Sequence, residues 1–408
     1  MYKLLILCVM TFNLIYDLVM RVLTVRQRKK PLPECVRDIY DEAEYSRWLD
    51  YTTEKSRVGL IGTVSDFVLG LLLFGTNVLS AVYYALPGGT YVRSALFMTV
   101  YALFLTVWSV PYEYYVTMKL EGRYGFNKTT VSTFVRDTIS NFVINTVVNI
   151  ALVLLAELMF TGMGAWAFVL LYGVIALFML AVNMLSMTFM RIFNSFTPLE
   201  EGSLRTRLVT MFREAGYELS DIRVMDASRR TTKVNAFCTG LGRFKKIALY
   251  DNLVENYTEE EIAAVFAHEL GHFKHGDTAK LTVYNLLTMG VLTLMIAAFA
   301  LVPQISLDYG FTEVSFAFAV CALSGVLLSP VMTVLGIPSA FLGRRYEYRA
   351  DRMAVELGFG EAMISVLKKL SRDNFAELEP HPVIVALEHN HPTVGQRIEA
   401  IRRGEGMR

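Results

Sequence analysis

Two histidines stand four residues apart in the stretch AAVFAHELGHFKHGD, which covers residues 263–277. Residues at this spacing share one face of an α-helix, so the imidazoles of His268 and His272 can bind a single zinc ion. Glu269 follows the first histidine and is offset from that face, near the water-bearing position of such a site. The stretch therefore predicts a hydrolytic zinc site in which Glu269 acts as general base rather than as a ligand.

The residues around the histidines predict a helix that starts at Thr258. Thr258 and Glu261 have the spacing of a capping box, in which each side chain bonds to the backbone N–H of the other residue. The alternative interpretation is the end of a surface helix with solvated histidines, and the capped, amphipathic pattern argues against it. The apolar side chains at helical spacing are Ile262, Val265, Phe266 and Leu270.

A catalytic zinc ion needs a third protein ligand and an open position. The stretch RRYEYRAD, residues 344–351, offers Glu347 and Asp351, which are four apart and share one helical face. Glu347 suits the third ligand, and Asp351 suits an acceptor that orients a ligating histidine through its far ring nitrogen. Taken alone, the stretch would be a solvated helix with a Glu/Arg ladder. It follows a predicted membrane hairpin that returns the chain to the face carrying His268, which favours the ligand role.

Two further stretches could contact a substrate. Asn235 lies near two predicted strands, residues 233–238 and 246–250, and its amide could bind a substrate backbone laid along an edge strand. The alternative is an asparagine that stabilises a turn. His389 and His391 precede a helix that we expect to begin at the following proline, and one of them could donate to a developing oxyanion. The alternative for that stretch is a solvated loop.

The composition indicates a membrane protein. Of the 408 residues, 54% are hydrophobic and 19% are charged, against about 25% charged in soluble proteins. The net charge of +1 gives no sign of nucleic-acid binding, and the four cysteines form no CxxC pair for a disulfide framework or a cysteine zinc site. A bilayer crossing needs about 20 apolar residues. Seven segments meet this requirement, at roughly 3–24, 59–86, 94–118, 138–161, 164–190, 281–303 and 314–338.

Basic residues alternate between the links that join these predicted spans. The links after spans one, three, five and seven are rich in Lys and Arg, whereas the others are short and nearly free of them. The positive-inside rule then places the N-terminus outside and the zinc site on the cytoplasmic side. The first span carries Asn13 and Asp17 and lacks a clear cleavage site, so we expect a retained span rather than a signal peptide.

Polar side chains recur within the predicted spans. Because they would be unfavourable facing lipid, we expect them to face protein or water. Hydrogen bonding between helices accounts for each residue singly, and the set as a whole favours a hydrated interior. The residues are Asp66, Asn77, Asn145, Asn149, Glu157 and Asn183.

Several short motifs, in a fixed order, carry a resemblance to a known family. They are EGRYGFNKTT at 121–130, IFNSFTPLEEGSLR at 192–205, and then KVNAF, HELGH, EYRAD and HPT. The ordered set resembles the CAAX prenyl protease type 1 family, which are a-factor-converting integral-membrane zinc metalloproteases. The resemblance implies seven spans around a large hollow chamber, and removal of the last three residues from isoprenylated CAAX peptides.

The resemblance also implies a role for each candidate residue by motif match. His275 receives no role, because FKHGD stands here where the family often has Trp and a downstream Asn-His. HPTVGQR stands where the family has HPPLxER. The implied roles are zinc ligation by His268, His272 and Glu347, base catalysis by Glu269, orientation of a ligand by Asp351, and contact with the substrate or transition state by Asn235 and His391.

The expected fold is mostly α, with a seven-transmembrane-helix bundle around a hydrated chamber and a small α+β, zincin-like catalytic portion of the HExxH gluzincin type. We expect residues 1–195 to hold five spans and 281–340 to form a transmembrane hairpin. Residues 196–280 and 341–408 would form the two catalytic parts. The expected cofactor is one Zn²⁺ ion, and the expected partners are a prenylated peptide or protein and membrane lipids.

The host membrane and two alternative functions remain open. The chain ends in RRGEGMR without a dilysine-like motif, so a bacterial inner membrane fits at least as well as the endoplasmic reticulum. An HtpX-like quality-control protease would share the HExxH motif and the downstream glutamate. A non-enzymatic zinc-bearing membrane module is the alternative outside the enzymes, and the intact Glu269 argues against it.

Overall fold

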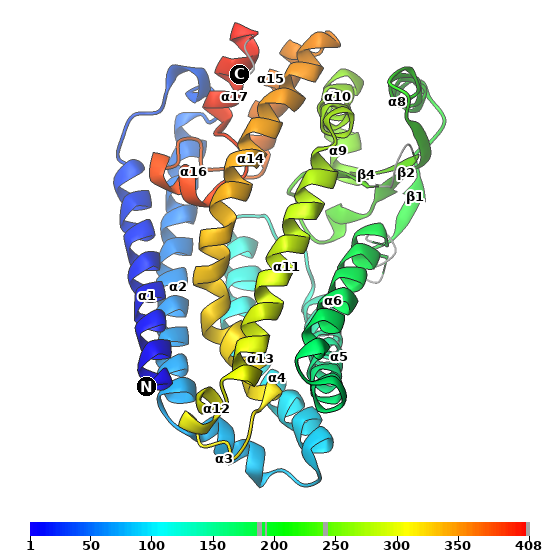
Figure 1. Cartoon of the computed structure of the whole chain (residues 1–408). Helices are drawn as coiled ribbons and strands as arrows, with labels where there is room; N and C mark the ends of the chain where they lie inside the picture. Colours follow the sequence, from blue (N-terminus) through cyan, green and yellow to red (C-terminus); the bar gives the residue numbers. More distant parts are fainter. Residues whose placement is uncertain (186–189, 192–193, 240–243, 405–408) are drawn as a thin grey trace.

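The computed structural model describes residues 1–185, 190–191, 194–239 and 244–404, and helices dominate it (Figure 1). The helices are α1 (Tyr2–Gln27), α2 (Glu42–Gly75), α3 (Val78–Ala85), α4 (Thr90–Tyr114), α5 (Val131–Met163), α6 (Ala167–Met184), α8 (Ser203–Glu214), α9 (Asp251–Asn256), α10 (Glu259–His275), α11 (Asp277–Leu301), α12 (Gln304–Asp308), α13 (Phe316–Ala322), α14 (Leu328–Glu356), α15 (Gly360–Asp373), α16 (Pro382–Glu388) and α17 (Val394–Arg403). The strands are β1 (Phe196–Pro198), β2 (Glu218–Met225), β3 (Ala236–Thr239) and β4 (Phe244–Tyr250). Short 3₁₀ turns lie at Glu34–Val36, Gly164–Trp166 and Ala227–Arg229, and π-helical turns lie at Tyr115–Glu121 and Leu323–Leu327.

Six helical segments of the described chain are long and apolar enough to cross a membrane. They are α1, α2, α4 with its π-helical continuation, α5, α11, and the unit of α13 and α14. These correspond to six of the seven predicted spans. The remaining prediction, residues 164–190, contains α6, whose apolar part Ala167–Val182 is shorter, and its residues 186–189 lie outside the described residues. A seventh crossing therefore stays a prediction.

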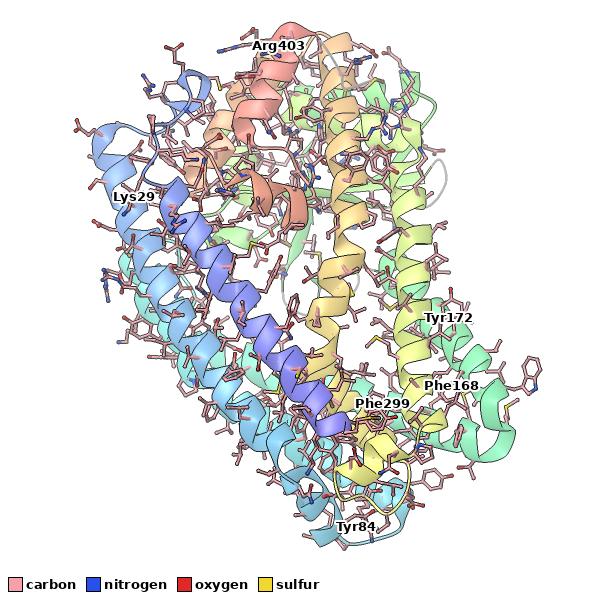
Figure 2. All side chains as sticks on the ribbon, turned by 60° about the vertical axis from the view of Figure 1, so that its left-hand side comes forward. Lys29, Tyr84, Phe168, Tyr172, Phe299 and Arg403 are labelled. Atoms are coloured by element: carbon pink, nitrogen blue, oxygen red, sulfur yellow. The ribbon has the colours of Figure 1, made fainter. Side chains whose placement is uncertain are left out.

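The long helices run side by side, and the two ends of the bundle differ (Figure 1). One end carries the N-terminus with α3 and α12, and the other carries the sheet, α10, α15 and the C-terminal α17. In Figure 2, Lys29 and Arg403 lie toward the second end, whereas Tyr84 lies at the first. The basic links after the first and last spans thus share one end of the molecule, as their charge predicts.

One predicted span is wrong, and one predicted span lies within a longer helix. The segment 59–86 is not one span, because α2 ends at Gly75 where the next residue, Thr76, is extended, and α3 follows as a separate helix. The last long helix extends beyond the predicted span at 314–338. Helix α14 continues without a break to Glu356, because its second half buries small side chains such as Ala350 against the catalytic part.

The end that carries the C-terminus has an apolar core between the sheet and its helices. The strand order is β1-β2-β4-β3, with β2 and β4 parallel. Ile247 and Leu249 of β4 are fully buried in one cluster with Phe212 of α8 and Phe266 of α10, so this core fixes α10 relative to the sheet. The two predicted strands are confirmed as the antiparallel pair β3 and β4, with β3 at an edge. The sequence reasoning missed β1 and β2.

The polar residues within the spans are satisfied in two ways. Glu157 of α5 is buried and accepts a hydrogen bond from Ser94 Oγ of α4 at 2.6 Å. Asn145 and Asn149 line a cavity of about 610 Å³ along α4 and α5. The side chain of Asn183 lies outside what the structure describes. Hydrogen bonding between helices therefore occurs as expected. The cavity is lined by both polar and apolar side chains, and a hydrated interior stays a prediction.

Candidate metal centre

Helices α10 and α14 touch at their backbones. A Cβ atom added to Gly271 would lie 2.8 Å from the Cα of Ala350. Such a contact does not occur between real side chains and backbone, so glycine is required for this approach. The approach brings the face of α10 that carries His268 and His272 against the face of α14 that carries Glu347.

The start of α10 is held by the predicted capping box and by a neighbouring helix. Thr258 Oγ1 accepts from the Glu261 N–H at 3.2 Å, and Glu261 Oε2 accepts from the Thr258 N–H at 2.9 Å. From α15, Ser365 Oγ and Lys369 Nζ each donate to Glu261 at 2.7 Å. Burial alone would raise the pKa of Glu261, but the hydrogen bonds from Lys369, Ser365 and Thr258 hold it below its usual value. A charged carboxylate thus anchors the helix that carries the histidines.

The side chains of His268, His272 and Glu347 converge on one point. The Nε2 atoms of the two histidines are 3.2 Å apart. His268 Nε2 lies 3.5 Å from Glu347 Oε2, and His272 Nε2 lies 3.4 Å from Glu347 Oε1. His268 and Glu347 are buried, and His272 is partly buried. The three side chains can therefore offer one ligand atom each to a shared metal ion.

The distances and the chemistry of these groups fit such an ion. Two ligand atoms about 2.1 Å from zinc are about 3.4 Å apart at the tetrahedral angle. Within the described residues, the buried Glu347 Oε2 has no hydrogen-bond partner, although His391 Nδ1 lies 3.0 Å and Arg397 Nη1 lies 3.1 Å away. Glu347 Oε2 is therefore ion-paired with Arg397 but makes no hydrogen bond of good geometry, so it can still accept a further partner. A metal ion would be such a partner.

Each of the two histidines has a carboxylate at its other ring nitrogen. Asp351 Oδ1 lies 2.9 Å from His268 Nδ1, and Asp277 Oδ2 lies 3.2 Å from His272 Nδ1. Both carboxylates are only 2% exposed. An acceptor at Nδ1 fixes the ring orientation and the tautomer, so that Nε2 is left free for a metal ion.

Arginines in turn compensate these buried carboxylates. Arg397 of α17 donates from Nε and Nη2 to the two oxygens of Asp351 at 2.8 and 2.6 Å. Arg349 of α14 donates to Asp277 Oδ1, and its guanidinium lies 4.8 Å from the centre of the Tyr346 ring. The site is therefore braced by three helices besides α10, namely α11, α14 and α17.

The electrostatics around His272 favour a positive charge there. Burial alone would lower the pKa of the imidazole, but the hydrogen bonds to Asp277 and Glu347 raise it to about 10. Burial beside Arg349 instead lowers the pKa of His275. The site around His272 thus has an excess of negative charge, which suits a metal cation equally well.

The other predicted site residues lie at different distances from this cluster. Glu269 follows His268 on α10 and is partly buried. His391, whose side chain is 58% exposed, points its Nδ1 at Glu347. Asn235 is exposed beside the edge strand β3, and its Oδ1 accepts from the Ala236 N–H at 2.8 Å. None of its hydrogen bonds within the described chain reaches the three convergent side chains.

The two histidines left without a firm role lie at helix ends. His275 is the last residue of α10, and its carbonyl accepts from Lys280 Nζ at 2.8 Å. His389 caps the end of α16, and its carbonyl accepts from Arg344 Nη1. The prediction that the next helix begins at the proline is wrong. Thr393 is the N-cap and forms a capping box with Gln396, so α17 begins at Val394, two residues after Pro392.

The sequence reasoning missed three residues of the site: Asp277, Arg349 and Arg397. Asp277 lies five residues after His272, beyond the left-handed Gly276 that separates α10 from α11. Its position just past the motif, in the same stretch as the histidines, was a usable signal. Arg349 lies in EYRAD and Arg397 lies in HPTVGQR. Neither motif indicates that these arginines bind Asp277 and Asp351.

Comparisons with known proteins place this geometry in a family. Residues 21–195 match the model of the CAAX prenyl protease N-terminal region with five membrane helices, and residues 198–405 match the model of peptidase family M48. The chain is 28% identical to the probable CAAX prenyl protease 1 of Schizosaccharomyces pombe, over 92% of this chain and 82% of that one. It is 26% identical to the CAAX prenyl protease 1 homolog of Oryza sativa subsp. japonica, over 99% and 98%.

A solved structure has the same fold. The crystal structure of S. mikatae Ste24p matches with a TM-score of 0.90 at 23% sequence identity, over 98% of this chain and 99% of that one. The family models together cover nearly the whole sequence, and the first includes membrane helices. The chain is therefore a multi-pass integral membrane metalloprotease, and it belongs to the CAAX prenyl protease 1 family within peptidase family M48.

Proposed function

We propose that the protein is a zinc endopeptidase that cleaves near the C-terminus of prenylated CAAX-type substrates. The convergence of the buried or partly buried side chains of His268, His272 and Glu347 carries the metal part of this proposal. The relatives described as CAAX prenyl proteases support the substrate part. The three convergent side chains would hold one zinc ion. Asp351 and Asp277 would orient the two histidines, and Arg397 would hold Asp351 in place.

The reaction requires a base, an oxyanion donor and a grip on the peptide. Bound zinc supplies Lewis acidity, which polarises a carbonyl and lowers the pKa of water. Glu269 takes a proton from the attacking water and delivers it to the leaving amine. His391 lies beside Glu347 with an exposed side chain, so it can donate to the developing oxyanion. Asn235, beside the open edge of β3, can bind the substrate backbone.

The membrane arrangement in this proposal places the site where lipid and water meet. The basic links favour a cytoplasmic site, α6 would complete the seventh span, and the sheet with α10 would form a zincin-like catalytic portion. A prenyl group could then stay out of water while the peptide end reaches the metal. The polar cavity along α4 and α5 supports a hydrated chamber beneath the site.

The test compares matched peptides that end in a CAAX motif, one farnesylated and one bare. Each is incubated with the purified protein with and without a zinc chelator, and the products are read by mass. We expect chelator-sensitive loss of the three terminal residues from the farnesylated peptide alone. Equal cleavage of both peptides would instead indicate a general membrane protease. Absence of cleavage with zinc bound would overturn the proposal.

A further inference from the structure

A polar groove runs along α4 and α5, away from the metal centre. Its volume is about 610 Å³, and the two helices pack side by side over much of their length. Polar and apolar side chains both line it, so neither a purely aqueous channel nor a lipid tail matches its surface. The polar lining includes Asp137, Asn141, Asn145 and Asn149.

One wall of the groove carries a regular row of side chains. Asp137, Asn141, Asn145 and Asn149 stand four residues apart on α5, so they share one face and all line the groove. Asn149 Nδ2 donates to the Asn145 carbonyl at 2.8 Å. Within the described residues, the exposed side-chain amides of Asn141 and Asn145 have no hydrogen-bond partner. Unpaired amides in a membrane helix are unfavourable, which indicates that they meet water or a ligand.

The spacing of these amides matches an extended polypeptide. Four residues of an α-helix rise by about 6.0 Å, and two residues of an extended chain advance by about 6.6–6.8 Å. Each asparagine amide offers N–H donors and a carbonyl acceptor, so it can bond to the C=O and to the N–H of a peptide group. Successive asparagines can therefore bond to alternate peptide groups of one extended strand, an interaction that an acyl or prenyl chain cannot make.

The groove also begins where a bound substrate would leave the catalytic part. Asp137, the first residue of this row, forms an ion pair with Arg230, and the Lys128 N–H donates to the Arg230 carbonyl at 3.1 Å. Arg230 lies five residues before Asn235 and the edge strand β3. A peptide extending from that edge would thus enter the groove at Asp137.

The length of the groove identifies which part of the substrate fits. From Asp137 to Asn149 the helix rises about 18 Å, which holds about five extended residues. The proposed cleavage releases only three residues, so the longer upstream portion is the better match. We propose that the groove is a second binding site for the extended polypeptide upstream of the prenylated cysteine, with Asn141 and Asn145 bonding to its backbone. The identification of the bound polypeptide as part of a prenylated substrate rests on the function proposed above. The proposal that the groove binds an extended polypeptide does not.

The test uses two farnesylated CAAX peptides that differ only in length, one with two residues and one with fifteen residues upstream of the cysteine. Binding is measured on the Glu269→Gln protein, so that it does not depend on turnover, and kinetics are measured on the active protein. The variant is Asn141→Ala with Asn145→Ala. The matched control is Ile139→Ala with Val143→Ala, on exposed positions of the same helix that do not line the groove.

We expect the asparagine variant to bind the long peptide about tenfold more weakly, which corresponds to about 1.4 kcal/mol and is of the size of two neutral hydrogen bonds. Its KM for the long peptide should rise with little change in kcat. The short peptide and the control variant should behave as the unmodified protein does. If the double variant is thermally unstable, binding of the long peptide is measured on Asn141→Ser and on Asn145→Ser separately. Each single variant should then show about half of the double variant's loss of affinity on a logarithmic scale.

Unchanged binding of the long peptide would overturn the proposal, and so would equal weakening of both peptides or the same loss in the control. These outcomes differ from failure of the proposed function. In that case the active protein cleaves neither peptide, while the binding measurements still report on the groove.

Discussion

In the metal centre, buried carboxylates and basic side chains lie in pairs that neutralise one another's charge. His268 and His272 each face a buried aspartate, and each aspartate faces an arginine, so the convergent Nε2 atoms are oriented from two directions. The histidine spacing predicted the convergence, because four residues on a helix fix one face. Asp351 was predicted for the same reason. Arg397 was not, because its contact with Asp351 spans 46 residues and depends on how α17 packs.

The role proposed for Asp277 can be measured as metal affinity. Replacing Asp277 with Asn removes the charged acceptor at His272 Nδ1 while keeping the size of the side chain. We expect zinc affinity to fall by about 10–100-fold, the usual effect of losing such a partner, as measured by competition with a chromogenic chelator. His275→Ala, at the end of the same helix, is the matched control and should keep its affinity. An unchanged affinity for Asp277→Asn would remove this aspartate from the account.

The contact between α10 and α14 depends on one glycine. In Gly271→Ala the new Cβ would clash with the Ala350 backbone, so the two helices must separate. We expect a loss of about 1–3 kcal/mol of stability, as for other overpacked cores, seen as a lower Tm in detergent, together with weaker zinc binding. The control is Gly336→Ala on α14, where a Cβ meets nothing within 4 Å. It should leave zinc affinity unchanged, and an equal loss in both variants would contradict the argument.

The anchored start of α10 should make stability depend on acid. The pKa of Glu261 is lowered in the folded protein, so its contribution is fully present above the ordinary carboxyl value of about 4.5. That contribution is lost as the pH falls through the lower folded value, where the carboxylate accepts a proton. We expect the Tm of the unmodified protein to fall across this range, and that of Glu261→Gln to be lower at neutral pH and to fall less. Parallel curves for the two proteins would exclude this role for Glu261.

The elements differ in how far the sequence could specify them. Hydrophobic runs predicted the membrane helices, because the need for about 20 apolar residues is local. Their ends were less certain. Helix α14 continues past the apolar run because Ala350 packs against α10, a contact that no local pattern contains. Strand β2 was missed because β3 comes between it and its parallel partner β4 in the sequence, so its pairing is set by the fold rather than by its own residues.

At the scale of the whole molecule, the chain joins a polar catalytic end to a bundle of apolar helices. The sheet, α10 and α17 lie at the end of the molecule opposite the N-terminus (Figure 1), and Asp137 of the groove is tied to this catalytic part by its ion pair with Arg230. This arrangement suits a substrate that is partly lipid and partly peptide. It also explains why so many apolar side chains are exposed on the helices, since these surfaces face the bilayer in the proposed arrangement.

In the proposed mechanism, one metal-bound site hydrolyses peptide bonds with Glu269 as its base. The most direct measurement is therefore made on Glu269→Gln, by determining zinc content and the rate of cleavage of a farnesylated CAAX peptide side by side with the unmodified protein. We expect one zinc ion in both proteins and a kcat lower by about 10²–10⁴-fold in the variant, the usual contribution of a general base. If the variant keeps its zinc and cleaves as fast as the unmodified protein, Glu269 is not the base.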